Sequence, residues 1–141
     1  MLTQKTTQFT VPLQNKPGEI ARLTQILEEE HINISGIMAE THGDEAVVRF
    51  LPEKEGAAVR RLLLGAGYMV FEKQVFELKL PNKPGEINRL LRHLIDEAVG
   101  LVSLYGTTAG DESARLILSA QPVDKAQTVL AKMAAKTHAV A

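Results

Sequence analysis

The stretch NKPGEIARL at residues 15–23 is repeated as NKPGEINRL at residues 82–90. A strand-like pattern precedes each copy, and a helical pattern begins inside it. We therefore interpret the chain as one structural unit written twice, with a first repeat at residues 1–73 and a second at residues 74–141. Halves of this size are near the lower limit for an independent core, so the repeats are expected to stabilise each other.

The residues before each motif alternate between apolar and polar side chains, which is the pattern of a strand with one buried face. The apolar positions match between the repeats: Phe9, Val11 and Leu13 in the first, and Phe76, Leu78 and Leu80 in the second. Within the motif, Pro17 or Pro84 suits the first position of a helix. Apolar residues then recur at helical spacing until about His31 and Val99.

The rest of each repeat also follows one order. The first repeat is expected to continue with strands at residues 34–41 and 46–51, a helix from residues 52–55 to Leu64, and a strand at residues 68–74. The second repeat is expected to continue with strands at residues 101–108 and 114–120, a helix from residues 122–125 to Ala135, and a short strand at residues 137–141. This order predicts an α+β fold of two ferredoxin-like βαββαβ repeats, each a four-stranded antiparallel sheet with two helices on one face.

Composition and motif content exclude several classes of function. The net charge of -1 leaves no basic surface for nucleic acid or an anionic membrane, and no cysteine is present for disulfides or thiolate chemistry. No phosphate loop, nucleophile elbow or histidine pair at metal-ligand spacing occurs. The sequence therefore predicts no enzyme, no cofactor and no metal site. A cytoplasmic location is expected, because residues 1–8 lack the apolar core of a signal peptide and no run is long enough to span a bilayer.

The repeated motif Asn-x-Pro-Gly-x-Ile-x-x-Leu at a strand-to-helix junction, followed by Asn33-Ile34-Ser35 at the second strand, resembles the ACT domain. Two copies make the chain similar to small proteins built of two ACT domains. The resemblance implies a regulatory, non-enzymatic protein that binds a small amino acid between paired domains. It also implies a homodimer, and an enzyme of amino-acid metabolism as a possible partner.

By the same resemblance, the ligand is held by the first strand-to-helix loop of one domain and by the start of the second strand of its neighbour. The implied ligand-binding residues are Asn15, Lys16, Pro17 and Gly18, then Asn82, Lys83, Pro84 and Gly85, with Asn33 and Ser35 on the second strand. A helix N-terminus offers N–H groups and partial positive charge to a carboxylate, and glycine permits close approach of the backbone.

The second repeat departs from this pattern, because Gly100 occupies the position of Asn33. Both repeats also carry a leucine, Leu13 or Leu80, where some family members have a histidine. A site made from the Asn82 loop and Asn33 is therefore complete, whereas one made from the Asn15 loop and Gly100 lacks a side chain. We expect one competent site per chain.

Two other interpretations remain open. Asn15 and Asn82 are also suited to be helix caps, an interaction typically worth about 1 kcal/mol. The alternative to a ligand-binding regulator is a structural interaction module with degenerate ligand sites, which pairs through exposed edge strands.

Overall fold

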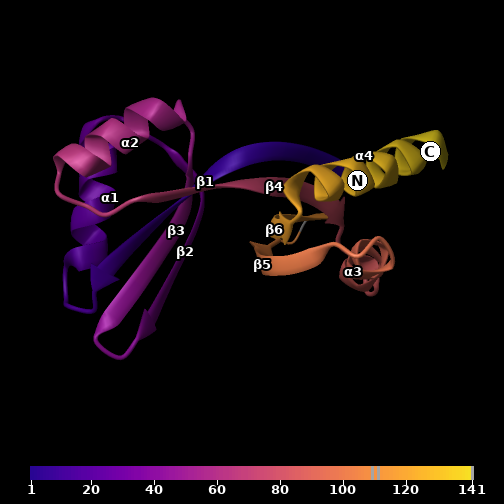
Figure 1. Cartoon of the computed structure of the whole chain (residues 1–141), viewed down its shortest axis with the longest axis horizontal. Coiled ribbons are helices and arrows are strands. Elements are labelled where there is room, and N and C mark those ends of the chain that lie inside the picture. The colour runs from indigo at the N-terminus through magenta and orange to yellow at the C-terminus, as the bar shows by residue number, and fades with distance from the viewer. Residues whose placement is uncertain (109, 111, 141) are drawn as a thin grey trace. The chain divides into compact units, whose positions relative to one another are not determined.

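A computed structural model describes residues 1–108, 110 and 112–140, the last four of them by their backbone alone. The elements follow one another as β1 (Leu2–Gln14), α1 (Glu19–Glu29), β2 (Ile34–His42), β3 (Glu45–Pro52), α2 (Gly56–Gly65), β4 (Phe71–Pro81), α3 (Glu86–Asp96), β5 (Gly100–Thr107), β6 (Ser113–Gln121) and α4 (Val123–Val140) (Figure 1). The predicted α+β class is confirmed. The strands form one six-stranded sheet in the order β2-β3-β1-β4-β6-β5.

The chain divides into two compact units. We call Thr7–Lys73 the first unit, and Met1–Thr6 together with Gln74–Ala141 the second unit. The expected repeats at residues 1–73 and 74–141 differ from these units in the placement of residues 1–6. The two long strands β1 and β4 therefore each contribute residues to both units.

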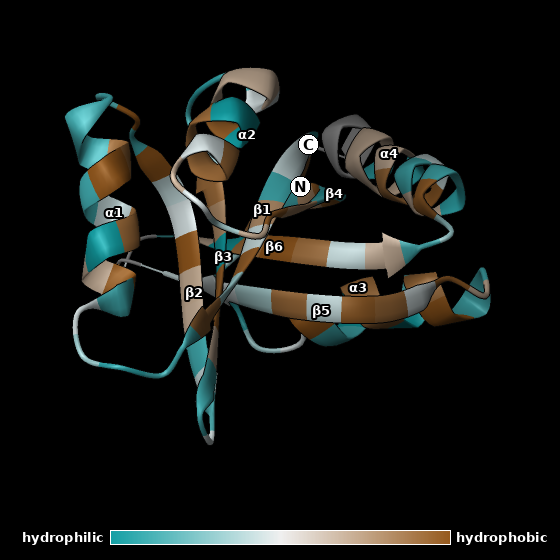
Figure 2. Cartoon of the chain, turned by 60° about the vertical axis from the view of Figure 1, so that its left-hand side comes forward, coloured by the Kyte–Doolittle hydropathy of each residue, from teal (hydrophilic) through white to brown (hydrophobic). Residues whose placement is uncertain are grey.

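The first unit has its core between the sheet and the helices α1 and α2. Phe9 pairs with Phe50 across β1 and β3, and their rings stack with centroids 5.7 Å apart. Leu23 and Leu27 of α1 and Val59 and Leu63 of α2 complete the buried cluster. Figure 2 shows that α1 carries both hydrophobic and hydrophilic residues around its axis, as expected of an amphipathic helix that packs on a sheet.

The first residues of β4 are tied to the first unit by an ion pair. Arg60 of α2 binds Glu72 of β4, with the Arg60 Nη2 atom 2.8 Å from Glu72 Oε1. The hydrogen bond from this guanidinium lowers the pKa of the Glu72 carboxyl. The contact joins a helix to a strand that otherwise leads into the second repeat.

The second unit repeats the same packing with different strands. Phe76, Leu78 and Leu80 of β4 face a cluster that contains Leu90 and Leu94 of α3 and Leu130 of α4. Met1 also packs against this cluster. The register of β4 and β6 pairs Leu78 with Leu116.

The predicted strand at residues 137–141 is wrong, because α4 continues to Val140, while residue 141 lies outside the described residues. The segment from Ala131 to Lys136 contains only good helix formers, with neither glycine nor proline to end the helix. Residues 2–6 of β1 lie in the second unit instead, beside β4. The strands expected at residues 68–74 and before the second motif are likewise one continuous strand, β4.

Gly106 on β5 is required by the close approach of β6. A Cβ atom on Gly106 would lie 2.3 Å from the Arg115 carbonyl oxygen and 2.9 Å from Leu116 Cα. Gly106→Ala is therefore expected to push β5 away from β6 and to lower the free energy of unfolding by about 1–3 kcal/mol, measured by urea denaturation.

Gly65→Ala is the matched control for this substitution. Gly65 ends α2, and a Cβ atom added to it would have no other heavy atom within 4 Å. Alanine is the better helix former, so this variant is expected to be unchanged or stabilised by up to about 1 kcal/mol. Equal free energies of unfolding for the two variants would contradict the predicted clash.

Candidate functional site

The first motif loop joins β1 to α1 and is held against the hairpin between β2 and β3. The backbone N–H of Asn15 donates to the Asp44 carbonyl at 2.8 Å, and Asn15 Nδ2 donates to the Gly43 carbonyl at 2.9 Å. Gly18 occupies the N-cap of α1 in the left-handed conformation, with φ of 87°. Lys16 and Pro17, which lie between them, are exposed.

The second motif loop has the same backbone geometry. The N–H of Asn82 donates to the Glu112 carbonyl at 2.8 Å, and Gly85 occupies the N-cap of α3 with φ of 91°. Asn82 Nδ2 lies 3.5 Å from Thr108 Oγ1, where the first repeat has a backbone carbonyl as acceptor. Lys83 and Pro84 are exposed.

The interpretation of Asn15 and Asn82 as helix caps is wrong. Glycine stands at both N-cap positions, and within the described part of the chain no side chain caps α1 or α3. Both asparagines brace the adjacent hairpin instead. The first helical N–H groups, those of Glu19 and Glu86, donate to the Lys16 and Lys83 carbonyls at 3.3 Å and 3.4 Å. Neither N-cap residue supplies a side-chain acceptor to the other N–H groups of the first turn, and helix N-termini of this kind favour anion binding.

Asn33 lies immediately before β2 and makes local contacts with both ends of its side chain. Its Nδ2 atom donates to Glu53 Oε2 at 2.8 Å, and its Oδ1 atom accepts from the Ile34 N–H at 3.0 Å. Ser35 Oγ donates to the Leu51 carbonyl at 3.3 Å. In the second unit, Gly100 pairs with Gln121 at the start of β5 and provides no comparable side chain.

Each domain's own loop and second-strand start lie at opposite ends of a helix. Gly18 precedes α1 and Asn33 follows it, and a helix of 11 residues is about 16 Å long. A single amino acid is too short to contact both ends. A ligand held by a loop and a second-strand start must therefore take them from different domains.

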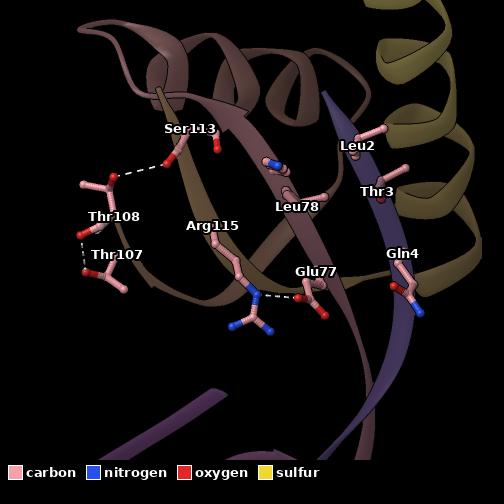
Figure 3. Close-up of a pocket in the computed structure, with 10 residues that line it drawn as sticks. Leu2, Thr3, Gln4, Glu77, Leu78, Thr107, Thr108, Ser113 and Arg115 are labelled. Atoms are coloured by element: carbon pink, nitrogen blue, oxygen red, sulfur yellow. Dashed lines mark hydrogen bonds and ion pairs between the residues drawn. The ribbon is translucent and has the colours of Figure 1, made fainter. Parts of the chain in front are cut away.

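A pocket of about 540 Å³ in the second unit was not anticipated from the sequence (Figure 3). It is lined by Leu2, Thr3 and Gln4 of β1, by Glu77, Leu78 and Lys79 of β4, and by Thr107, Thr108, Ser113 and Arg115 around the β5–β6 hairpin. The alternation of Glu77 and Lys79 with apolar residues already indicated a polar face of β4. What the sequence did not indicate was that residues 2–4 lie along the same face.

The described residues contain no group of three or more acidic, histidine or cysteine side chains placed to hold a metal ion. No helix among them is long and apolar enough to cross a membrane.

Several solved structures share this fold. Protein BT0572 from Bacteroides thetaiotaomicron superposes with a TM-score of 0.85 at 24% identity, over 93% of this chain and 90% of that chain. The ligand-free regulatory subunit of aspartate kinase from Thermus thermophilus gives a TM-score of 0.67 at 12% identity, over 92% and 95% of the two chains. Aspartokinase III of E. coli, in complex with lysine and aspartate, gives a TM-score of 0.57 at 13% identity, over 95% of this chain and 32% of that chain.

The family model described as an ACT domain pair matches residues 4–138, which is nearly the whole chain. This match covers both copies of the motif and both uncapped helix ends. The resemblance drawn from the repeated motif is confirmed, and the protein belongs to the ACT domain pair family.

Proposed function

We propose that the protein is a non-catalytic regulator that binds a free amino acid at its motif loops. The observation that carries this proposal is the repeated loop geometry, in which an uncapped helix N-terminus lies beside a left-handed glycine. Two sequence copies have kept this geometry although a capping side chain would stabilise each helix by about 1 kcal/mol. Aspartokinase III, which shares the fold, was determined with lysine and aspartate, so amino acids are the first ligands to test.

The ligand's carboxylate would receive hydrogen bonds from the first-turn N–H groups and would be favoured by the helix dipole. The absence of a Cβ on Gly85 leaves open space beside the backbone. An asparagine amide both donates and accepts, so Asn82 and Asn33 suit the ammonium and carboxylate groups of an amino acid. We propose Asn82 to Gly85 with Asn33 and Ser35 as the competent site, and Asn15 to Gly18 as the weaker copy, because Gly100 lacks a side chain.

Regulation follows if occupancy changes how the chain associates with a second copy or with an enzyme of amino-acid metabolism. Such coupling requires the ligand to bind one assembly more tightly than another, typically by about 1 to 3 kcal/mol. A ligand contacted by two domains depends on their relative placement, so it can supply this difference. We propose the homodimer as the basic assembly.

A thermal-shift screen against the standard amino acids tests the proposal. A ligand at 100 times its dissociation constant stabilises the folded state by about 2.7 kcal/mol, which gives a measurable rise in melting temperature. A folded sample that responds to none of them would contradict amino-acid binding.

For the ligand found by the screen, Asn82→Ala and Asn33→Ala are each expected to weaken binding about tenfold, because each removes hydrogen bonds to a charged group. Asn15→Ala is the matched control and is expected to leave the affinity nearly unchanged. Calorimetry should give one site per chain. Equal losses from Asn15→Ala and Asn82→Ala, or two equal sites per chain, would contradict the proposed asymmetry.

The second candidate is a structural interaction module without a ligand. It is favoured by the outer strands of the sheet, β2 and β5, which expose the apolar side chains of Ile37, Leu101 and Val102. Exposed strand edges of this kind promote pairing with another chain. A stable dimer that forms in the absence of amino acids, and that no amino acid alters, would favour this candidate over the regulator.

A further inference from the structure

We propose that the 540 Å³ pocket of the second unit is a separate binding site for an acidic amino acid. We call it the sheet-face pocket. It does not include the motif residues Asn82 to Gly85, and it lies within the second unit alone. The inference therefore does not rest on the function proposed for the motif loops.

The sheet-face pocket lies on the side of the sheet that faces away from the helices. Phe76, Leu78 and Leu80 point into the core of the second unit, so the intervening Glu77 and Lys79 point to the opposite face. Lys79 is paired with Arg115 across β4 and β6, which places two cations side by side. Figure 3 shows the Arg115 and Glu77 side chains joined between Thr107 and Thr108 on one side and Leu2 to Gln4 of β1 on the other.

These charges match those of an acidic amino acid. Arg115 Nε donates to Glu77 Oε1, and the two side chains are 39% and 28% exposed, so the pair is partly withdrawn from solvent. Lys79 has no ion-pair partner among the residues that the structure describes. Lys79 and Arg115 are both cations, and aspartate and glutamate each carry two carboxylates. Lys79 and Arg115 suit the two carboxylates, and Glu77 suits the ammonium group.

Hydroxyl groups and an amide surround this charged cluster. Thr3 and Gln4 lie on one side along β1, and Thr107, Thr108 and Ser113 lie on the other (Figure 3). Such groups can donate to carboxylate oxygens or accept from an ammonium group. A cavity with a few convergent polar groups on a preformed floor is the usual form of a small-molecule site.

The first unit lacks this cluster, although its strands have the same register. By the motif alignment, Pro12 corresponds to Lys79, and Val47, which pairs with Pro12, corresponds to Arg115. Solubility alone requires polar side chains on the exposed sheet face of either repeat, and it does not require two neighbouring cations on one of them. The difference indicates that the second unit has a role that the first unit does not share.

Occupancy of the sheet-face pocket is linked to the N-terminal strand segment. Leu2, Thr3 and Gln4 form one wall, so the complete pocket exists only when residues 2–4 lie beside β4. A ligand that binds only this arrangement stabilises it by mass action. Binding of an acidic amino acid should therefore slow hydrogen exchange of the backbone amides at residues 2–6.

The test is calorimetry on the full chain with L-aspartate and L-glutamate, and with L-asparagine and L-glutamine as neutral analogues. Acidic ligands are expected to bind at least about tenfold more tightly than the neutral ones, and to weaken as salt is added. Lys79→Gln is expected to lower the affinity for the acidic ligand about tenfold, whereas Lys79→Arg, which keeps the charge, retains it.

Lys73→Gln is the matched control, since Lys73 is an exposed lysine on the same face of β4 but does not line the pocket. Its affinity for acidic ligands should equal that of the unsubstituted chain. Absence of acidic-ligand binding at millimolar concentration, or equal losses from Lys79→Gln and Lys73→Gln, would overturn the inference. Binding of L-aspartate or L-glutamate that depends on Asn82 and Asn33 but not on Lys79 would place the acidic ligand at the motif loops and overturn this inference.

Discussion

Deletion of residues 2–6 is expected to unfold the second unit while the core of the first unit remains folded. These residues are the part of β1 that lies beside β4 in the second unit. Their removal leaves one edge of β4 without a neighbour and takes Met1 away from the core cluster. Each backbone hydrogen bond contributes a net stabilisation of about 0.5–1.5 kcal/mol, and the deletion removes several of them. The free energy of unfolding of the second unit should therefore fall by roughly 3 kcal/mol or more, which is a large fraction of the stability of so small a unit.

Hydrogen exchange resolved by residue measures this outcome. Amides of residues 74–81 in β4 and those of β5 and β6 should lose protection, while those of β2 and β3 keep it. Lys5→Ala is the control, because it removes only the exposed contact between Lys5 Nζ and Gln127 Oε1 at 3.3 Å. Full protection of β4 and β6 after the deletion would show that residues 2–6 are not part of the second unit's fold.

Phe50→Ala is expected to lower the free energy of unfolding of the first unit by about 3–5 kcal/mol. The Phe50 side chain is fully buried, and its ring stacks on that of Phe9 with an interplanar angle of 24°. The substitution removes both the buried area and the aromatic contact, and it leaves a cavity beside Phe9.

Phe71→Ala is the matched control for this prediction, because Phe71 also belongs to the first unit but is 56% exposed. Its free energy of unfolding should change by no more than about 0.5 kcal/mol. Both variants can be measured by urea denaturation with hydrogen exchange to assign the loss to a unit. Similar losses from the two substitutions would contradict the predicted core of the first unit.

Most elements were predictable because local patterns dictate them. The alternation of Phe9, Val11 and Leu13 corresponds to β1, and the helical spacing after each motif corresponds to α1 and α3. The expected hairpins match β2 with β3 and β5 with β6. These features depend on neighbours within a few residues, where periodicity and turn chemistry are decisive.

The candidate site was less predictable, because hydrogen-bond partners distant in sequence decide its geometry. Asn15 was open to interpretation as a helix cap, yet its side chain binds the Gly43 carbonyl of a hairpin. Asn33 was predicted to bind the ligand, and in the structure its side-chain amide donates a hydrogen bond to Glu53. The pairing of Lys79 with Arg115 in the sheet-face pocket depends on strand register, which alternation along one strand does not reveal.

By itself, the duplicated motif of residues 15–23 and 82–90 determined that the chain is one unit written twice with two matching helix starts, since duplication and periodicity are local properties of the sequence. The same motif carried the resemblance to the ACT domain, which the match to the family model confirms. Only the tertiary structure decided that residues 2–6 lie beside β4 in the second unit, while residues 137–140 continue helix α4. The sequence does not decide which segment pairs with β4, because the edge of a strand can form hydrogen bonds with any of several segments that alternate apolar and polar residues. Packing against a core such as that around Leu78 and Leu90 selects one of them.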